Sequence, residues 1–219
     1  MLLNNKSLEE RVDYYYLILK KYNLSDAVGS KFLHAYNNIV KNMTDCVIFG
    51  NSWEHNLNGK RPFTRDIYEA AANIKSGFIT PKALSILNDK MLDRKEKTEL
   101  TTNEHIFSPQ TRGYFICDMW FELFSNNLDY FFKEMTLLST TIISTVEENN
   151  IFKKFTINSK ETEGRIRLRV KTEDRYPAAG VHQLWSTKDG RYINGFPFDL
   201  SDEFLKYEKD YLLIWKKIW

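Results

Sequence analysis

The sequence lacks the features that mark secreted, membrane and disulfide-rich proteins. It contains only two cysteines, Cys46 and Cys117, and no CxxC pair, so we expect free thiols and a cytoplasmic chain. Residues 1–16 have no apolar signal-peptide core, and no apolar run approaches the ~18 residues needed to span a bilayer. These absences predict a soluble protein with no membrane partner.

Several enzyme signatures are also missing. The chain has no P-loop, GxGxxG, GxSxG or HExxH pattern, which argues against NTPases, dinucleotide enzymes, serine hydrolases and zincins. The net charge of +2 excludes a histone-like polycation. A nucleic-acid enzyme remains compatible with this charge, because its basic residues can be concentrated locally.

The amino-acid composition is that of an ordinary globular protein. Of the 219 residues, 42% are hydrophobic and 27% are charged, which are values of a folded protein. Because there is no repeat, low-complexity tract or Gly/Ser linker, we predict a single α+β domain, rich in helix, with a small mixed or antiparallel sheet. We divide it into a helical part (1–97), a catalytic core (98–155), and a basic strand with a C-terminal helix (156–219).

Local patterns predict the individual elements. Proline at the first helical position, after Thr80 and after Ser108, indicates two helix starts, and Thr145 with Glu148 forms a capping box. Apolar spacing and caps predict helices near 7–22, 26–42, 64–77, 80–92, 109–123, 128–138, 145–155 and from 201 onward. β-branched runs and period-two alternation predict strands near 45–50, 139–145 and 164–171, with 181–186 paired to the last of these, and a further strand is expected to end at Glu104-His105.

One short stretch carries chemistry. TELTTNEHIFSPQ (98–110) places the carboxylate of Glu104 and the imidazole of His105 side by side at the end of an expected strand. A histidine with a pKa near neutrality can deprotonate a water molecule, and a neighbouring carboxylate can hold a divalent cation. Hard oxygen ligands favour Mg²⁺ or Mn²⁺ over zinc. This stretch therefore predicts metal-assisted hydrolysis of a phosphodiester.

Glu104-His105, followed by the strand and helix of STTIISTVEENNIFKKF (139–155), resembles the acid–histidine dyad of the His-Me finger (HNH) nucleases. In that family the histidine sits on a β-hairpin and a short helix supplies a further His or Asn to the metal. The resemblance covers about residues 98–155. It implies His105 as the general base, Glu104 as a metal ligand, and Asn149 as a metal or orienting ligand. The chain departs from the family pattern in the long segment before residue 139 and in having no CxxC knuckles.

A second nuclease pattern leaves an alternative open. In the restriction-enzyme core, an acid is followed about ten residues later by Glu-x-Lys, and Asp89 and Glu99 have this separation. Thr101 stands where the lysine should be. A degenerate form of that core would use Glu99 or Glu104 as a metal ligand and His105 in place of the lysine.

Basic residues indicate a surface for nucleic acid. Residues 153–175 contain eight basic and four acidic side chains. In the predicted strand, alternate positions place several of the basic side chains on one face, where a phosphate backbone would balance them. A further arginine lies in the first turn after Pro109, within expected reach of a phosphate near the dyad. The predicted DNA-binding residues are Arg112, Lys154, Arg165, Arg167, Arg169 and Lys171.

Together these patterns predict a divalent-metal-dependent DNA endonuclease. A lone domain of this size suits a type II restriction enzyme that acts as a homodimer on a palindromic site in double-stranded DNA, because twofold symmetry then matches the site. Asn, Lys, Ile, Tyr and Phe are abundant, which is the amino-acid bias of proteins encoded by AT-rich genomes. Such a source suits a restriction enzyme that cuts rarely, at a site made only of A and T. The competing interpretation is a non-catalytic DNA-binding or protein-interaction module of a phage or mobile element, and an RNase is a third.

Overall fold

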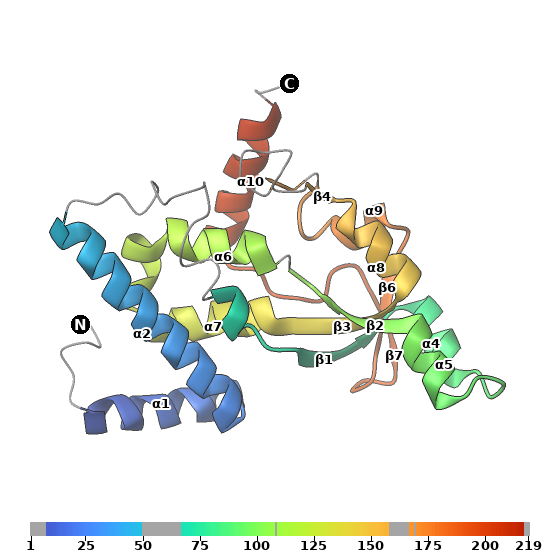
Figure 1. Cartoon of the computed structure of the whole chain (residues 1–219). Coiled ribbons are helices and arrows are strands. Elements are labelled where there is room, and N and C mark those ends of the chain that lie inside the picture. Colours follow the sequence, from blue (N-terminus) through green and yellow to red (C-terminus); the bar gives the residue numbers. More distant parts are fainter. Residues whose placement is uncertain (1–7, 50–66, 108, 158–166, 169, 217–219) are drawn as a thin grey trace. The chain divides into compact units, whose positions relative to one another are not determined.

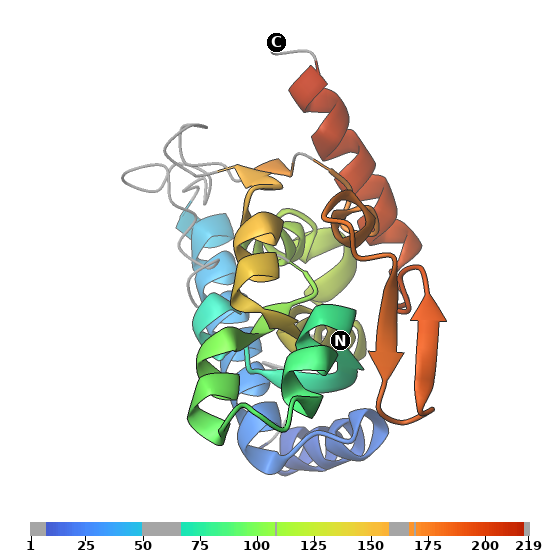
Figure 2. The same cartoon turned by 90° about the vertical axis from the view of Figure 1, so that its right-hand side faces the viewer.

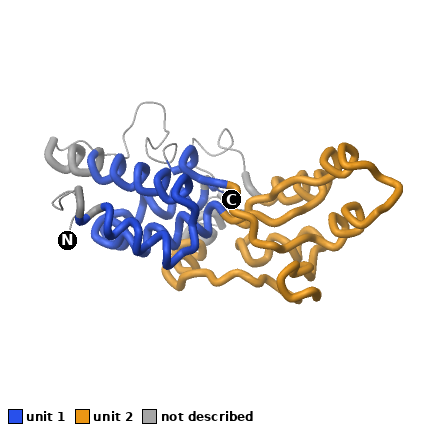
Figure 3. The backbone as a smooth tube through the Cα atoms, turned by 90° about the horizontal axis from the view of Figure 1, so that it is seen from below, with its two compact units in different colours: residues 1–72, 108–139 blue, residues 73–107, 140–219 orange. Residues whose placement is uncertain are grey.

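The fold combines helices with one mixed sheet, which confirms the α+β prediction. The computed structural model describes residues 8–49, 67–107, 109–157, 167–168 and 170–216 (Figure 1). The chain divides into two compact units, drawn in two colours in Figure 3. We call residues 1–72 and 108–139 the helical unit, and residues 73–107 and 140–219 the sheet unit. The single domain expected from the sequence stays a prediction.

The helical unit combines two segments that are distant in sequence. Its elements are α1 (Leu8–Tyr22), α2 (Asp26–Phe49), a helical turn at 67–70, α6 (Pro109–Asp118), the π-helix η3 (Trp120–Phe124) and α7 (Leu128–Ser139).

Close packing within this unit depends on its small and aromatic residues. Helices α1 and α2 approach closely at Gly29, where a Cβ atom would lie 2.2 Å from Leu19 Cδ2. Helix α7 packs against α1, α2 and α6. Interlocking aromatic side chains fill the centre. They are Phe32, Tyr36, Phe115, Trp120, Phe124, Phe131 and Phe132.

The sheet unit is built on five strands in the order β2-β3-β1-β6-β7. Strands β1 and β3 are parallel neighbours, and every other neighbouring pair is antiparallel. A separate two-stranded ladder joins β4 to β5. The strands are β1 (Ile74–Ile79), β2 (Thr101–His105), β3 (Thr140–Thr145), β4 (Thr156–Ile157), β5 (Arg167–Leu168), β6 (Gln183–Ser186) and β7 (Arg191–Asn194).

Short helices cover this sheet. Helix α8 packs against β2 and β3, α5 against β2, and α4 against β3 and β6. Figure 2 shows β6 and β7 as a hairpin, with the C-terminal helix α10 drawn above it. The helices are α4 (Pro81–Asn88), α5 (Arg94–Leu100), α8 (Val146–Lys153), α9 (Arg175–Ala178) and α10 (Asp202–Lys216).

A buried carboxylate joins the starts of α4 and α8. Both helices follow parallel neighbouring strands, so their N-termini lie at the same end of the sheet. The Thr80 hydroxyl donates to Glu148 Oε2 over 2.6 Å, and the Thr145 amide donates to the same oxygen over 2.9 Å. The predicted capping box at Thr145 is therefore confirmed, and it also ties α8 to α4.

Two predictions in the first half of the chain were wrong. Residues 45–49, expected in a strand, continue helix α2. Of the helix expected over 64–77, residues 67–70 are helical, but its second half is wrong, because strand β1 occupies Ile74–Ile79 at the centre of the sheet. Gly77, read as a helix stop, has a φ of +82° within that strand, where the register against β3 shifts.

Further corrections concern the second half of the sheet unit and the charged segment. Strand β6 pairs with β1 and β7, not with the basic segment as expected. Of that segment, only Arg167–Leu168 is described as a strand, paired with β4. The charged stretch after Asp93 forms α5 and begins with a capping box that includes Glu96. None of the helices in the described part of the chain is both long and apolar enough to cross a membrane.

Candidate functional site

The predicted dyad lies at the last two positions of strand β2. β2 and β3 form an antiparallel ladder in which Glu104 faces Ile142 and His105 faces Thr141. The Ile106 amide donates to the Thr140 carbonyl over 3.1 Å, so the ladder continues one residue past the dyad. The strand end that carries the acid and the imidazole is thus fixed by backbone hydrogen bonds.

Helix α8 follows β3 directly and packs back on both strands. The resulting order is strand, antiparallel strand, helix. The His-Me finger resemblance implies a β-hairpin before the helix, whereas residues 106–139 separate these two strands in the chain. Asn149 and Phe152 are three positions apart on α8, so they share one side of the helix. Asn149 is half-buried, and its Oδ1 atom is buried without a hydrogen-bond partner in the described part of the chain.

Arg175 links the dyad to α8. From the short helix α9, its Nη2 donates to the His105 carbonyl over 2.9 Å and forms an ion pair with the Glu104 carboxylate. Its guanidinium also lies 5.6 Å from the ring centroid of Phe152 on α8. In Figure 1, α8 and α9 are drawn close to the labelled strand β2. The second half of α8 therefore returns to the strand end that carries Glu104 and His105.

The surroundings of Arg175 are apolar and aromatic. The ring of Phe152 packs edge-on against Tyr176 at 5.0 Å, and both rings are buried. Burial lowers the pKa of Arg175 from its ordinary value and raises the pKa of Tyr176 to about 12. An arginine pKa starts so high that the guanidinium stays charged at neutral pH. A permanent positive charge is thus held against the candidate site.

The turn before α9 is anchored to the C-terminal helix. Glu208 on α10 is buried, and its Oε1 accepts a hydrogen bond from the Thr172 amide over 2.9 Å and another from the Thr172 hydroxyl. The Arg175 amide in turn donates to the Thr172 carbonyl over 3.3 Å. α10 thereby fixes the turn from which Arg175 extends.

Two oxygen-bearing side chains of the sheet unit are of the kind that Mg²⁺ and Mn²⁺ prefer. Asn149 has an amide oxygen that is buried and has no hydrogen-bond partner in the described part of the chain, and the Glu104 carboxylate is paired with Arg175. None of the described contacts brings Asn149 to Glu104. Across the described ranges, no cluster contains three or more His, Cys, Asp or Glu side chains placed to hold a metal ion. A site here would therefore depend on the amide and on oxygens from substrate or water.

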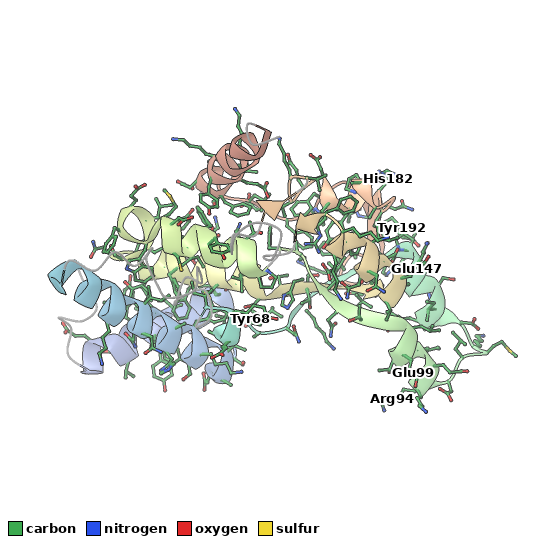
Figure 4. All side chains as sticks on the ribbon, turned by 45° about the horizontal axis from the view of Figure 1, so that its top comes forward. Tyr68, Arg94, Glu99, Glu147, His182 and Tyr192 are labelled. Carbon is green, nitrogen blue, oxygen red and sulfur yellow. The ribbon has the colours of Figure 1, made fainter. Side chains whose placement is uncertain are left out.

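Glu99, the other predicted metal ligand, lies elsewhere. It belongs to helix α5, where its side chain is exposed and pairs with Lys95 at 3.8 Å. Figure 4 shows Glu99 beside Arg94 on this helix. None of the described contacts brings it to Glu104. The position of Glu99 therefore does not favour the form of the restriction-enzyme alternative that uses Glu99 as a metal ligand, and the form that uses Glu104 stays a prediction.

The predicted DNA-binding residues have mixed outcomes. Lys154 caps the end of α8 and is exposed, and Lys171 is exposed and pairs with Glu173 at 3.4 Å. Arg165 and Arg169 lie outside the described residues, and of Arg167 only the backbone in β5 is described.

The prediction that Arg112 contacts DNA requires correction. Arg112 lies on α6, and its side chain has no exposed surface. It forms an ion pair with Glu134 of α7 at 2.5 Å, within the helical unit. A guanidinium enclosed in this way cannot reach a phosphate on the surface, so we assign Arg112 to the core.

Arg175 is the residue that the sequence reading did not identify. It stands in TEDRYP (172–177), where two acidic neighbours made it look like one of many surface charges. Its partner Glu104 is far away in sequence. The one local sign was an arginine directly before an aromatic residue and a proline, which does not by itself indicate burial.

Comparisons with known proteins identify no relative. A scan against models of protein families gives no match, and neither the curated proteins nor the solved structures contain a significantly similar one.

Proposed function

We propose that this chain is a divalent-metal-dependent endonuclease that hydrolyses phosphodiester bonds in double-stranded DNA. One observation carries the proposal. An antiparallel strand pair ends in Glu104-His105, and the helix that follows it places a buried, unpartnered amide oxygen of Asn149 in the same unit. This arrangement supports the His-Me finger resemblance, which was based on sequence alone.

Each residue has a definite task in this proposal. His105 accepts a proton from the attacking water, which requires its neutral imidazole form. Glu104 and Asn149 supply oxygen ligands for Mg²⁺ or Mn²⁺, and the ion when bound neutralises the charge that develops on the phosphate. Exposed Lys154 and Lys171 contact the phosphate backbone and position the duplex without reading sequence.

The biological setting remains part of the proposal. A cytoplasmic type II restriction enzyme would act as a homodimer on a palindromic site. The competing proposal is a non-catalytic DNA-binding module, and the Glu104–Arg175 ion pair favours it to some extent, because a carboxylate with a buried counter-charge needs no metal. Cleavage assays separate the two.

The test compares His105→Ala with a matched control, His182→Ala. His182, labelled in Figure 4, is exposed and belongs to the same unit, and none of the described side-chain contacts joins it to Glu104 or Asn149. Supercoiled plasmid is incubated with each protein and Mg²⁺ or Mn²⁺, and initial rates are read from gels. We expect EDTA to abolish cleavage, and His105→Ala to lower the rate about 10²–10⁴-fold, because a general base contributes that much. His182→Ala should cleave like the unmodified protein.

The outcomes distinguish the proposals. Defined bands that depend on metal and on His105 support a site-specific endonuclease. DNA retention in a gel-shift assay, with no cleavage under any divalent ion, supports the binding module. Cleavage of RNA but not of DNA would identify an RNase. Cleavage unaffected by His105→Ala would contradict the assignment of the general base.

A further inference from the structure

Helix α1 packs into the helical unit through one face only. The residues of this inner face recur at i, i+3, i+4 and i+7, and they are Tyr15, Ile18, Leu19 and Tyr22. Ile18 and Leu19 are buried, and the Tyr22 hydroxyl donates to the Asp129 carbonyl of α7 over 3.0 Å. α1 therefore has a fixed inner face against α2 and α7.

The opposite face of α1 carries a second stripe with the same spacing. Its four residues are Asp13, Tyr16, Leu17 and Lys20, and we call them the α1 outer stripe. Tyr16 is 61% exposed and Leu17 is 64% exposed. A helix that packs through one face usually has polar residues on the other, so two adjacent large apolar residues there indicate a contact with another molecule.

The two ends of the outer stripe have opposite charges. Asp13 lies one turn before the apolar pair and Lys20 one turn after it, and both are exposed. Within the described part of the chain, neither side chain has an ion pair or a hydrogen bond, whereas the neighbouring Lys21 pairs with Asp129 of α7. The order acid, apolar, apolar, base is complementary to itself when the helix direction is reversed.

We propose that the α1 outer stripe is the surface through which two copies of this chain associate, with α1 antiparallel to its copy. A twofold axis between Tyr16 and Leu17 sets Asp13 against Lys20 of the partner subunit, and Tyr16 against Leu17 of the partner subunit. A parallel pair would instead set like charges against each other, so the charges select the antiparallel arrangement. The pairing uses no residue of the candidate site and does not require cleavage.

The size of the stripe determines how tightly the copies can bind. A helix of 15 residues is about 22 Å long and about 10 Å wide, so one of its sides offers only a few hundred Å². Standard stable interfaces bury roughly 1,200–2,000 Å² in total. We therefore expect a dimer that dissociates on dilution, with a Kd on the order of micromolar.

The test measures the oligomeric state of the full-length protein by sedimentation velocity over concentrations that span the expected Kd. Leu17→Glu should abolish the dimer, because it sets an unpaired carboxylate against the apolar centre of the partner's stripe. Asp13→Lys and Lys20→Asp should each raise Kd about tenfold or more, because two symmetry-related pairs become repulsive. Lys41→Asp is the matched control, since Lys41 is an exposed lysine of α2 in the same unit, and its Kd should not change.

Mixing the two charge variants tests the antiparallel register itself. In a dimer of one Asp13→Lys subunit and one Lys20→Asp subunit, the introduced lysine faces the introduced aspartate, and the native Asp13 faces the native Lys20. Both pairs are attractive again, so the mixture should dimerise with a Kd within about threefold of the unmodified protein. Because neither variant dimerises well alone, this recovery cannot come from a change in folding.

Several outcomes would overturn the pairing. An unmodified protein that stays monomeric at every concentration would leave the stripe to another partner or to the sheet unit of the same chain. A dimer that survives Leu17→Glu would use a different surface. Charge variants that weaken the dimer alone but do not recover when mixed would reject the antiparallel register. Thermal unfolding of each variant confirms that it is folded, which is expected because the substituted side chains are exposed.

Failure of this pairing can be told apart from failure of the nuclease proposal. If the unmodified protein cleaves DNA but does not dimerise through α1, only the pairing is lost. If it dimerises as described but cleaves no nucleic acid under any divalent ion, only the nuclease proposal is lost.

Discussion

Among the described residues, each unit contains a buried ion pair between arginine and glutamate, and the two pairs differ in what surrounds them. In the helical unit, Arg112 and Glu134 join α6 to α7, and both side chains have no exposed surface. In the sheet unit, Arg175 and Glu104 retain 5% and 12% exposure and lie at a strand end beside His105. The Arg112–Glu134 pair is therefore fully enclosed, whereas the Arg175–Glu104 pair is slightly open to solvent.

This difference in exposure determines what each pair can contact. An enclosed pair has no access to ligands, so its effect is confined to stability and to the choice of one packing arrangement. The Arg175–Glu104 pair keeps residual exposure and lies at the strand end where Arg175 also binds the His105 carbonyl. Exposure therefore distinguishes the two pairs, whereas the pairing of arginine with glutamate is common to both.

A third pair extends the comparison to the surface. Lys21 of α1 and Asp129 of α7 meet at 2.8 Å, with 56% and 41% of their side chains exposed. Water and salt screen such a pair, so it should contribute little. The three pairs form a series from enclosed to solvated, and one substitution in each tests whether burial sets the effect.

The largest effect on stability is expected for Glu134→Gln. The substitution leaves Arg112 enclosed without its counter-charge, which should cost roughly 3–5 kcal/mol and lower the midpoint of thermal unfolding by about 10 °C. Calorimetry and urea unfolding measure this loss. The double variant Arg112→Met with Glu134→Leu should recover most of it, because no unpaired charge remains. A full loss in the double variant would show that packing, not charge, dominates.

Glu104→Gln should have a smaller effect on stability and a larger one on cleavage. Water can reach the released guanidinium to some extent, so we expect a loss of about 1–3 kcal/mol by urea unfolding. Cleavage by the variant should fall well beyond what the unfolded fraction explains. A stability loss equal to that of Glu134→Gln, with unchanged cleavage, would make the two buried pairs equivalent and remove the comparison.

Asp129→Asn should change stability least. The expected loss is about 0.2–1 kcal/mol at low salt, and it should disappear in about 1 M NaCl, where the Debye length is near 3 Å. Urea unfolding at the two salt concentrations provides the measurement. A loss that persists at high salt would mean that the carboxylate acts through packing rather than through its charge.

Local sequence signals predicted those parts of the site that local forces determine. The start of α8 follows from the Thr145–Glu148 capping box, and β3 follows from its β-branched residues. Strand β2 was expected to end in the dyad, and it does. Caps, turns and side-chain period are encoded over a few residues, so a single sequence is sufficient for them.

Contacts between residues that are distant in sequence could not be predicted from these local patterns. Strand β1 was missed because its Gly77 suggested a helix end, whereas the position tolerates a positive φ at an irregular pairing with β3. Arg112 was assigned to DNA because its partner Glu134 lies on another helix. Arg175 escaped notice for the same reason, since Glu104 reaches it only through the fold. Which charge is buried depends on tertiary packing, and no local pattern records it.

The β2–β3 pair is not a simple hairpin, and this has a consequence for how the chain folds. Between His105 and Thr140 the chain leaves the sheet unit to build α6, η3 and α7 of the helical unit. Closing a long loop costs more entropy than closing a tight turn, and contacts between distant residues slow folding. During synthesis, the aromatic core of α1 and α2 is completed only when α7 is made, because α7 packs against both helices. Strand β2, which carries Glu104 and His105, can pair with β3 only after α7, because β3 follows α7 in the chain. Refolding kinetics of this chain should therefore report the two units forming together.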